Sequence, residues 1–261
     1  MFTIFVILIS GFKFLYKQEV VFSVSLVLLL SILYFATKKI PRKNMRLLWA
    51  TLAMLFLFRL SPSVGQGFGW WLMDELKFSP MFFGILSQVG AVMSLIVIWF
   101  MAETIARKSA GTVLLGLIFA GALMTLPEIL AYYEVTEALG ISNKLLFVFD
   151  TGIGSPLAHI SMIPLLTLIA VSAPVYSRGL WFALASSLLN LALMGSNIMT
   201  KYLNMIFTIS REIKSPEGET LVTADYSQLG VLLWTVIVLG LVVPLAGWAI
   251  WKRVSRRFER A

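Results

Sequence analysis

The chain has 261 residues, of which 59% are hydrophobic and 13% are charged, and its formal net charge is +8. A soluble domain carries about 25% charged residues, so a water-soluble globular fold is excluded and lipid must solvate most of the surface. The absence of cysteine also excludes disulfides, thiolate metal sites and cysteine nucleophiles. The composition predicts an all-α integral membrane protein built as a polytopic helix bundle.

Eight apolar segments are long enough to cross a bilayer as helices, which takes about 20 residues each. Their wealth of Leu, Phe and Met without period-2 alternation favours helices over a transmembrane barrel. The longest polar stretch, 210–227, is expected to form an exposed turn. The predicted spans are 1–16, 19–37, 46–72, 80–102, 110–132, 145–172, 178–207 and 228–251.

The loops between these spans alternate in charge. Basic loops stay in the cytoplasm, so we expect both termini to be cytoplasmic, most simply in a cell (inner) membrane. The opposite loops are poor in basic residues and comparatively acidic, around 74–77, 128–137 and 211–225. The basic set consists of Lys38, Lys39, Arg42, Lys43, Arg46, Arg107, Lys108, Arg178, Lys252, Arg253, Arg256, Arg257 and Arg260.

Proline and glycine interrupt two of the spans. Pro62 and Gly65 fall within 46–72, while Pro156 and Pro164 fall within 145–172. A proline removes a helical hydrogen bond, and the freed carbonyl must find a protein partner or face a wet cavity. Broken spans are therefore candidates for lining a pathway, although Gly and Pro are also simply common in membrane helices.

Ionisable residues inside membrane spans cost about 2.5–3.5 kcal/mol each on insertion scales, and three of them stand out as candidates for function. Arg59 falls near the middle of the third span, and Asp150 and His159 fall in the sixth. We expect Arg59 and Asp150 to face a central cavity, where they bind a charged solute or exchange protons; a structural pair or a hydrated Asp150 is the alternative. His159 points to the opposite side of a straight helix and can instead bond a helix carbonyl.

Ser187, Asn190 and Asn197 form a polar stripe on one face of the seventh span. Such a stripe can contact a solute or bond a neighbouring helix. Gln66, in the Gly-rich GQGFG at 65–69, is a further candidate. That segment lacks the preceding strand and following lysine of a phosphate loop, and the single DTG at 150–152 lacks the second copy that an aspartic protease needs. We expect neither a metal site nor a cofactor, and no nucleic-acid partner.

Five segments occur in a distinctive order. They are FRLSPS (58–63), LKFSPMFFGILSQVG (76–90), LGISNKLLFVFDTGIGSPLAHISMIPLLTLIA (139–170), LWFALASSLLN (180–190) and ADYSQLGVLLWTVIVLGLVVPL (224–245). This order resembles the folate–biopterin transporter family of the major facilitator superfamily. The residues on family motif positions are Pro62, Pro80, Gly84, Asp150, Pro164, Ser187 and Asn190.

The resemblance implies a transporter of folates, pterins or similar organic anions that works by alternating access, with protons as a candidate coupling ion. It also implies two six-helix halves. On that basis 46–261 is a C-terminal half with a basic cytoplasmic tail, 38–45 a cytoplasmic linker, and 1–37 two helices of an incomplete N-terminal half. We therefore expect a fragment whose remaining half is absent or supplied by another polypeptide.

Two other classes of function remain open. A non-transporting membrane subunit or remnant would fit an incomplete half. An intramembrane enzyme would use Asp150 or His159, but it needs a second catalytic group on a facing helix, and the sequence offers no convincing pair. Ligand-dependent thermal stabilisation separates a binding protein from a remnant, and product formation without vectorial movement identifies an enzyme.

Overall fold

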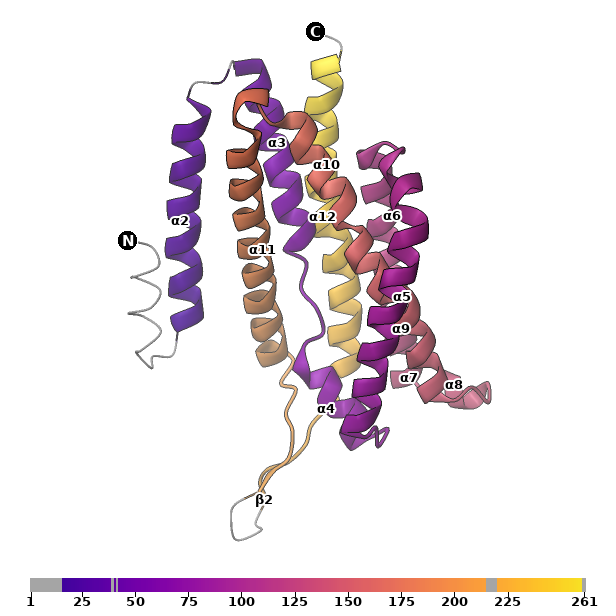
Figure 1. Ribbon diagram of the computed structural model, residues 1–261. Coiled ribbons are helices and arrows are strands. Elements are labelled where there is room, and N and C mark those ends of the chain that lie inside the picture. The colour runs from indigo at the N-terminus through magenta and orange to yellow at the C-terminus, as the bar shows by residue number, and fades with distance from the viewer. Residues whose placement is uncertain (1–15, 39, 41, 215–219, 260–261) are drawn as a thin grey trace.

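The computed structural model describes residues 16–38, 40, 42–214 and 220–259, and they form a bundle of long helices with one short hairpin (Figure 1). The predicted span 1–16 lies outside the described residues apart from Tyr16. The helices are α2 (Lys17–Thr37), α3 (Arg42–Arg59), α4 (Gln66–Asp74), α5 (Pro80–Ala106), α6 (Ala110–Leu123), α7 (Leu126–Tyr132), α8 (Val135–Ala138), α9 (Asn143–Ile160), α10 (Met162–Ser172), the short 3-10 helix η1 (Val175–Ser177), α11 (Arg178–Ile206) and α12 (Leu229–Glu259).

Six helical segments of the described chain are long and apolar enough to cross a bilayer, and each overlaps a predicted span. Their outer faces carry large apolar side chains, such as Trp99 at 81% exposure, which suits contact with lipid. The segments are Lys17–Thr37, Pro80–Ala106, Ala110–Tyr132, Asn143–Ser172, Val175–Ile206 and Leu229–Arg257. The all-α, polytopic membrane fold predicted from composition is confirmed.

The predicted span 46–72 is divided into two helices. α3 ends at Arg59, residues 60–65 are not helical, and α4 begins at Gln66. Pro62 cannot continue the hydrogen-bond ladder, and Gly65 adopts a positive φ of 81°. The interruption predicted here is confirmed.

Two other spans bend at places that prolines explain only in part. The chain leaves the helix at Met124–Thr125, ahead of Pro127, and again at Ser161, ahead of Pro164. A proline has no N–H for the carbonyl four residues earlier, so the helix loosens on its N-terminal side. Pro156, in contrast, lies inside α9 without ending it, so the interruption predicted at this residue is wrong.

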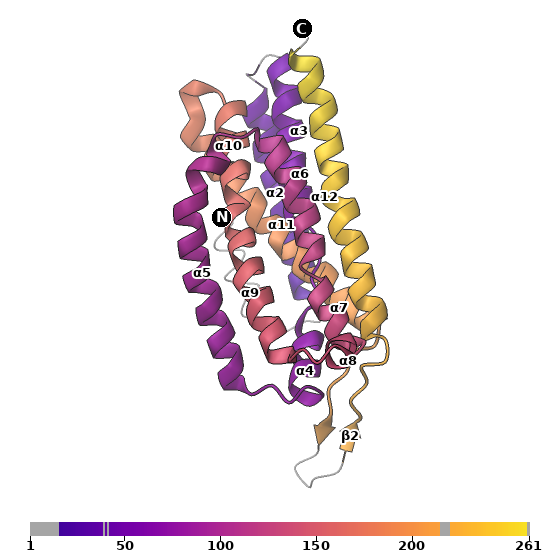
Figure 2. The ribbon, with the colours of Figure 1, turned by 90° about the vertical axis from the view of Figure 1, so that its right-hand side faces the viewer.

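The helices pack in two connected groups. α3 lies between α11 and α12, with α2 on the outer side of α11 (Figure 1). α5 pairs closely with α9, and α6 and α10 join this pair to the first group (Figure 2). One apolar cluster includes Leu55, Leu165 and Trp181; a second, around α4, includes Trp71 and Leu229.

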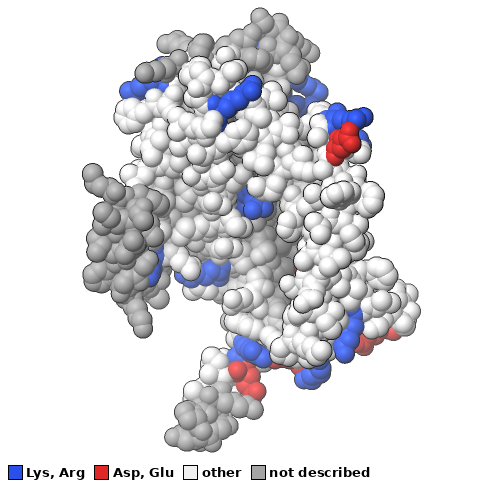
Figure 3. Space-filling model, viewed as in Figure 1, with Lys and Arg blue, Asp and Glu red and all other residues white. Residues whose placement is uncertain are grey.

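Charged residues gather at the two ends of the bundle, with a mostly uncharged band between them (Figure 3). The end of α2, the start of α3 and the C-terminal end of α12 lie at one end of the bundle, whereas α4 and α8 lie at the other (Figure 1). At the second end, the predicted turn 210–227 is a hairpin of β1 (Ile213–Lys214) and β2 (Thr220–Val222). The sorting of loops by charge therefore corresponds to the two ends of the bundle.

Candidate functional site

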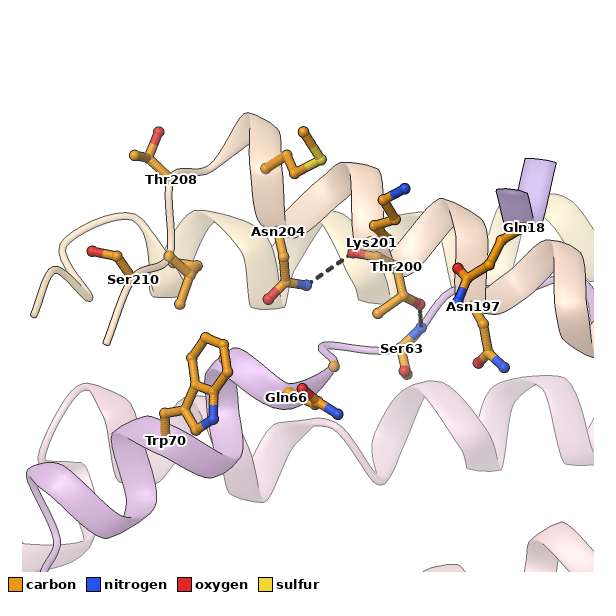
Figure 4. A pocket seen from close by; sticks show the side chains of 14 residues that line it. Gln18, Ser63, Gln66, Trp70, Asn197, Thr200, Lys201, Asn204, Thr208 and Ser210 are labelled. Carbon is orange, nitrogen blue, oxygen red and sulfur yellow. Dashed lines mark hydrogen bonds between the residues drawn. The ribbon is translucent and has the colours of Figure 1, made fainter. Parts of the chain in front are cut away.

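The break between α3 and α4 opens onto a cavity of about 850 Å³. Side chains of α4 and α11 face each other across it, and Gln18 of α2 closes one side (Figure 4). The lining residues are Gln18, Ser63, Gly65, Gln66, Gly67, Trp70, Asn197, Thr200, Lys201, Asn204, Met205, Thr208, Ile209 and Ser210. A broken helix beside a cavity with polar lining residues is an arrangement found at the binding sites of many transporters.

Three side chains of α11, spaced four residues apart, satisfy backbone groups that the break leaves without helical partners. At this spacing they lie on one face of α11. Without them, unpaired peptide groups inside a membrane would cost several kcal/mol each. The bonds are Ser196 Oγ to the Ser61 carbonyl at 2.6 Å, the Ser63 N–H to Thr200 Oγ1 at 3.0 Å, and Asn204 Nδ2 to the Val64 carbonyl at 2.8 Å.

The glycines of GQGFG allow α4 to approach α11 closely. A Cβ on Gly65 would lie 2.7 Å from Thr200 Cγ2, and one on Gly67 would lie 2.7 Å from Asn204 Oδ1. Real Cβ atoms do not approach neighbours so closely, so larger residues would push the two helices apart. The Gly-rich segment is thus a packing surface and the turn of a broken helix.

The cavity combines one positive charge with neutral hydrogen-bonding groups. Lys201 is the one charged side chain among the described residues that line it. Carboxamides from Gln18, Gln66, Asn197 and Asn204 supply both donors and acceptors, and the Trp70 indole supplies an apolar plane. Such a set can hold a planar polar ring together with an anionic group.

Lys201 is already paired. Its Nζ lies 2.7 Å from Oε1 of Glu19 on α2, and Oε1 also accepts a hydrogen bond from the Tyr202 hydroxyl at 3.0 Å. In Figure 4 the lysine extends away from α4, whereas Asn197, Thr200 and Asn204 point toward the broken helix. Lys201 therefore lies at the rim of the cavity, between it and α2.

Of the residues predicted from sequence, Gln66 and Asn197 line the cavity, whereas Arg59 and Asp150 are not among its lining residues. Arg59 ends α3 directly before the break, and its Nε is buried without a hydrogen-bond partner among the described residues. Neither Arg59 nor Asp150 takes part in the three ion pairs found in the described part of the chain. The structure does not bring these two residues together as a pair.

Asp150 has an acidic neighbour that its sequence position did not suggest. Glu128, expected in an outer loop, lies instead in α7, which packs against α9, and its Oε2 is buried. The charge of Asp150 is close enough to act on Glu128. Oδ1 of Asp150 is also buried, and neither oxygen has a hydrogen-bond partner within the described residues. The structure thus places two carboxyl groups inside the bundle where the sequence suggested one.

The remaining predicted residues face outward. Ser187 and Asn190 are exposed on α11, and the Ser187 hydroxyl donates to the Ala183 carbonyl of its own helix. His159 is also exposed, and its Nδ1 lies 2.9 Å from the Ser155 carbonyl oxygen. This contact is the helix-carbonyl bond that was the structural alternative for His159.

Sequence reasoning overlooked the α11 residues that hold the broken helix, although a signal was present. Ser196, Thr200 and Asn204 recur every four residues, and Lys201 is an ionisable residue inside the predicted span 178–207. The predicted stripe included Asn197 but took Ser187 and Asn190 as its other members. The sequence did not show which face of α11 points inward.

Side-chain contacts join the hairpin to α4 at one end of the bundle, next to the cavity-lining residues Thr208 to Ser210. Arg211 contacts Asp74 through two nitrogens at 3.0 and 3.2 Å, and the Tyr226 hydroxyl donates to Asp74 Oδ2 at 2.6 Å. Burial acts to raise the pKa of Asp74, but the bonds from Tyr226 and Arg211 outweigh it and lower this pKa below its usual value. The tie therefore favours the ionised carboxylate.

Comparison with known proteins supplies the family. The chain matches the family model described as the BT1 family over residues 5–261, which is nearly its whole length. No curated protein and no solved structure matches it. The chain belongs to the BT1 family of folate–biopterin transporters, and it is accordingly a multi-pass membrane transport protein.

Proposed function

We propose that the cavity between α4 and α11 binds a planar organic anion of folate or pterin type, which the protein carries across the membrane by alternating access. The observation that supports this most directly is the lining itself. A pterin ring has a flat face for Trp70 and an edge of amino and oxo groups for the carboxamides of Gln66 and Asn197. A carboxylate on that ring would find Lys201 as its counterion.

The broken helix supports the same proposal on mechanical grounds. Residues 60–65 are held to α11 by side-chain hydrogen bonds and not by a continuous helical ladder. Such a segment can change its backbone angles without unfolding a whole span. We propose that the break is the point where α3 and α4 move relative to each other as the cavity opens to alternate sides.

We also propose a membrane topology and a division of the chain into two halves and a linker. The basic loops and both termini lie in the cytoplasm of a cell whose inner membrane holds the protein, following the positive-inside rule. The family architecture places its site between two six-helix halves. We therefore assign residues 46–261 to one half, 38–45 to the linker and 1–37 to two helices of the other half.

Proton coupling is the finer part of the proposal. Carboxyl groups inside membrane spans mark proton pathways in transporters. Asp150 and Glu128 each have a buried oxygen without a described partner, and they lie on helices that contact each other. We propose that this pair, separate from the solute cavity, takes up and releases the coupling proton.

Direct binding to the full chain in lipid nanodiscs tests the proposed site. Pterin-6-carboxylate and the neutral 6-methylpterin are titrated by calorimetry, and we expect the carboxylate to bind more tightly. Lys201→Gln should weaken carboxylate binding about tenfold, the equivalent of one modest ion pair, and leave the neutral ligand unchanged. Gln66→Leu should weaken both ligands because it removes contacts to the ring edge.

Lys144→Gln is the matched control, because Lys144 is an exposed lysine at the start of α9 and does not line the cavity. It should bind both ligands like the wild type. Absence of binding by either ligand to the wild type, or equal losses in Lys144→Gln and Lys201→Gln, would refute the assignment of the cavity.

A further inference from the structure

The contact between Glu19 and Lys201 is unusual among the ion pairs of the described residues because it joins two membrane helices. Glu103 near the end of α5 pairs with Arg107 directly after that helix, and Arg211 and Asp74 lie at the hairpin end. Lys201 and Glu19 are separated by 182 positions in sequence and bring α11 and α2 together. Ionisable residues on membrane helices often mark functional sites, so this pair is a candidate for a role beyond packing.

The link forms part of the cavity wall. Lys201 lines the cavity, and so does Gln18, the neighbour of Glu19 on α2. Lys201 thus belongs both to the lining of the cavity and to the ion pair with Glu19. An anion in the cavity and Glu19 would then compete for a single cation.

The two oxygens of the Glu19 carboxylate differ in their contacts. Oε1 accepts bonds from both Lys201 and Tyr202, whereas Oε2 is buried without a hydrogen-bond partner in the described part of the chain. A carboxylate with one unused buried oxygen loses hydration that the pair does not fully replace. A second carboxylate can offer Lys201 the same ionic contact that Oε1 of Glu19 makes.

From this geometry we propose that Glu19 is a built-in counterion that an anionic substrate displaces from Lys201, and that the displacement releases α2 from α11. The proposal rests on the proposed function, because it takes the cavity to be the substrate site. It adds that anion binding and the α2–α11 contact are coupled. A neutral ring would fill the cavity without breaking the link.

The first test is the ratio of affinities for pterin-6-carboxylate and 6-methylpterin in nanodiscs. Glu19→Gln removes the competing charge, so the carboxylate should bind about three- to tenfold more tightly while the neutral ligand is unaffected. Glu103→Gln, which breaks the exposed pair with Arg107 at the end of α5, is the matched control and should leave the ratio unchanged. An unchanged or lowered ratio in Glu19→Gln overturns the counterion proposal.

The second test follows the helices in the otherwise wild-type chain. Because the sequence has no cysteine, Val27→Cys on α2 and Leu193→Cys on α11 give a uniquely labelled pair at exposed positions. The spin–spin distance should lengthen with the carboxylate and stay constant with 6-methylpterin. An unchanged distance at saturating carboxylate overturns the release of α2, even if Glu19→Gln does not fold.

The two proposals fail in different ways. If neither ligand binds, the proposed function is refuted together with the counterion role. If both ligands bind but neither the affinity ratio nor the distance changes, only the counterion role is refuted.

Discussion

Replacing Asn204 with leucine removes the side chain that holds the non-helical segment against α11. Asn204 Nδ2 donates to the Val64 carbonyl at 2.8 Å and to the Thr200 carbonyl of its own helix at 2.9 Å. The Thr200 carbonyl lies within α11 and is served by its helix, whereas the Val64 carbonyl lies in the break. Leaving a buried carbonyl unpaired costs about 1–3 kcal/mol, and interhelical hydrogen bonds in membranes average about 0.6 kcal/mol. We therefore expect Asn204→Leu to lower the free energy of unfolding by about 1–2 kcal/mol.

For a chain of this size that loss corresponds to a fall in Tm of about 3–6 °C. Tryptophan fluorescence during thermal unfolding in detergent measures it, with Asn190→Leu as the matched control, because Asn190 is an exposed asparagine on the same helix. The control should melt within about 1 °C of the wild type, as surface changes usually do. Equal melting temperatures for the two variants would show that Asn204 does not hold the break.

Three further outcomes follow from other contacts. Gly65→Ala should lower Tm more than Gly69→Ala. A Cβ at position 65 would lie 2.7 Å from Thr200 Cγ2 on a backbone with φ of 81°, whereas a Cβ at position 69 would meet no atom within 4 Å. Equal melting curves for the two variants would contradict this prediction. Asp74→Asn should destabilise the hairpin end by about 1 kcal/mol at pH 7, a modest value because the pair is partly exposed. Since folding lowers the pKa of Asp74, the wild type should be more stable than Asp74→Asn above about pH 4, and this difference should disappear as the pH falls through the folded pKa. A difference in stability that persists in acid would contradict the role of the ionised Asp74. If the proposed proton coupling holds, Asp150→Asn and Glu128→Gln should each abolish uptake driven by a pH gradient in proteoliposomes but keep ligand binding. Unchanged uptake in both variants would refute the proposed coupling pair.

The positions of the spans and the break at Pro62 could be predicted because both depend on local properties. A bilayer accepts any helix that is apolar over about 20 residues, whatever its neighbours are. Pro62 and Gly65 disturb a helix through their own backbone chemistry, so their effect is visible in the sequence. Pro156 shows the limit of this reasoning, since α9 continues through it while the chain bends at Ser161.

The candidate site could be predicted only in part. Gln66 and Asn197 line the cavity as candidates, but Ser187 and Asn190 share α11 and face outward. Membrane helices are apolar on nearly every side, so their hydrophobic pattern does not reveal the inward face. Without that face, the roles of Thr200 and Asn204 could not be separated from those of their neighbours.

By itself, the sequence determined that this protein is an all-helical membrane protein, where its spans lie, how its loop charges divide, and which family it resembles. Only the tertiary structure decided that α11 holds the break, that Glu128 lies near Asp150, and that Glu19 pairs with Lys201. The physical reason is the separation along the chain over which each interaction acts. Hydropathy, proline and glycine act within one segment, whereas a hydrogen bond or an ion pair depends on which distant segment packs alongside.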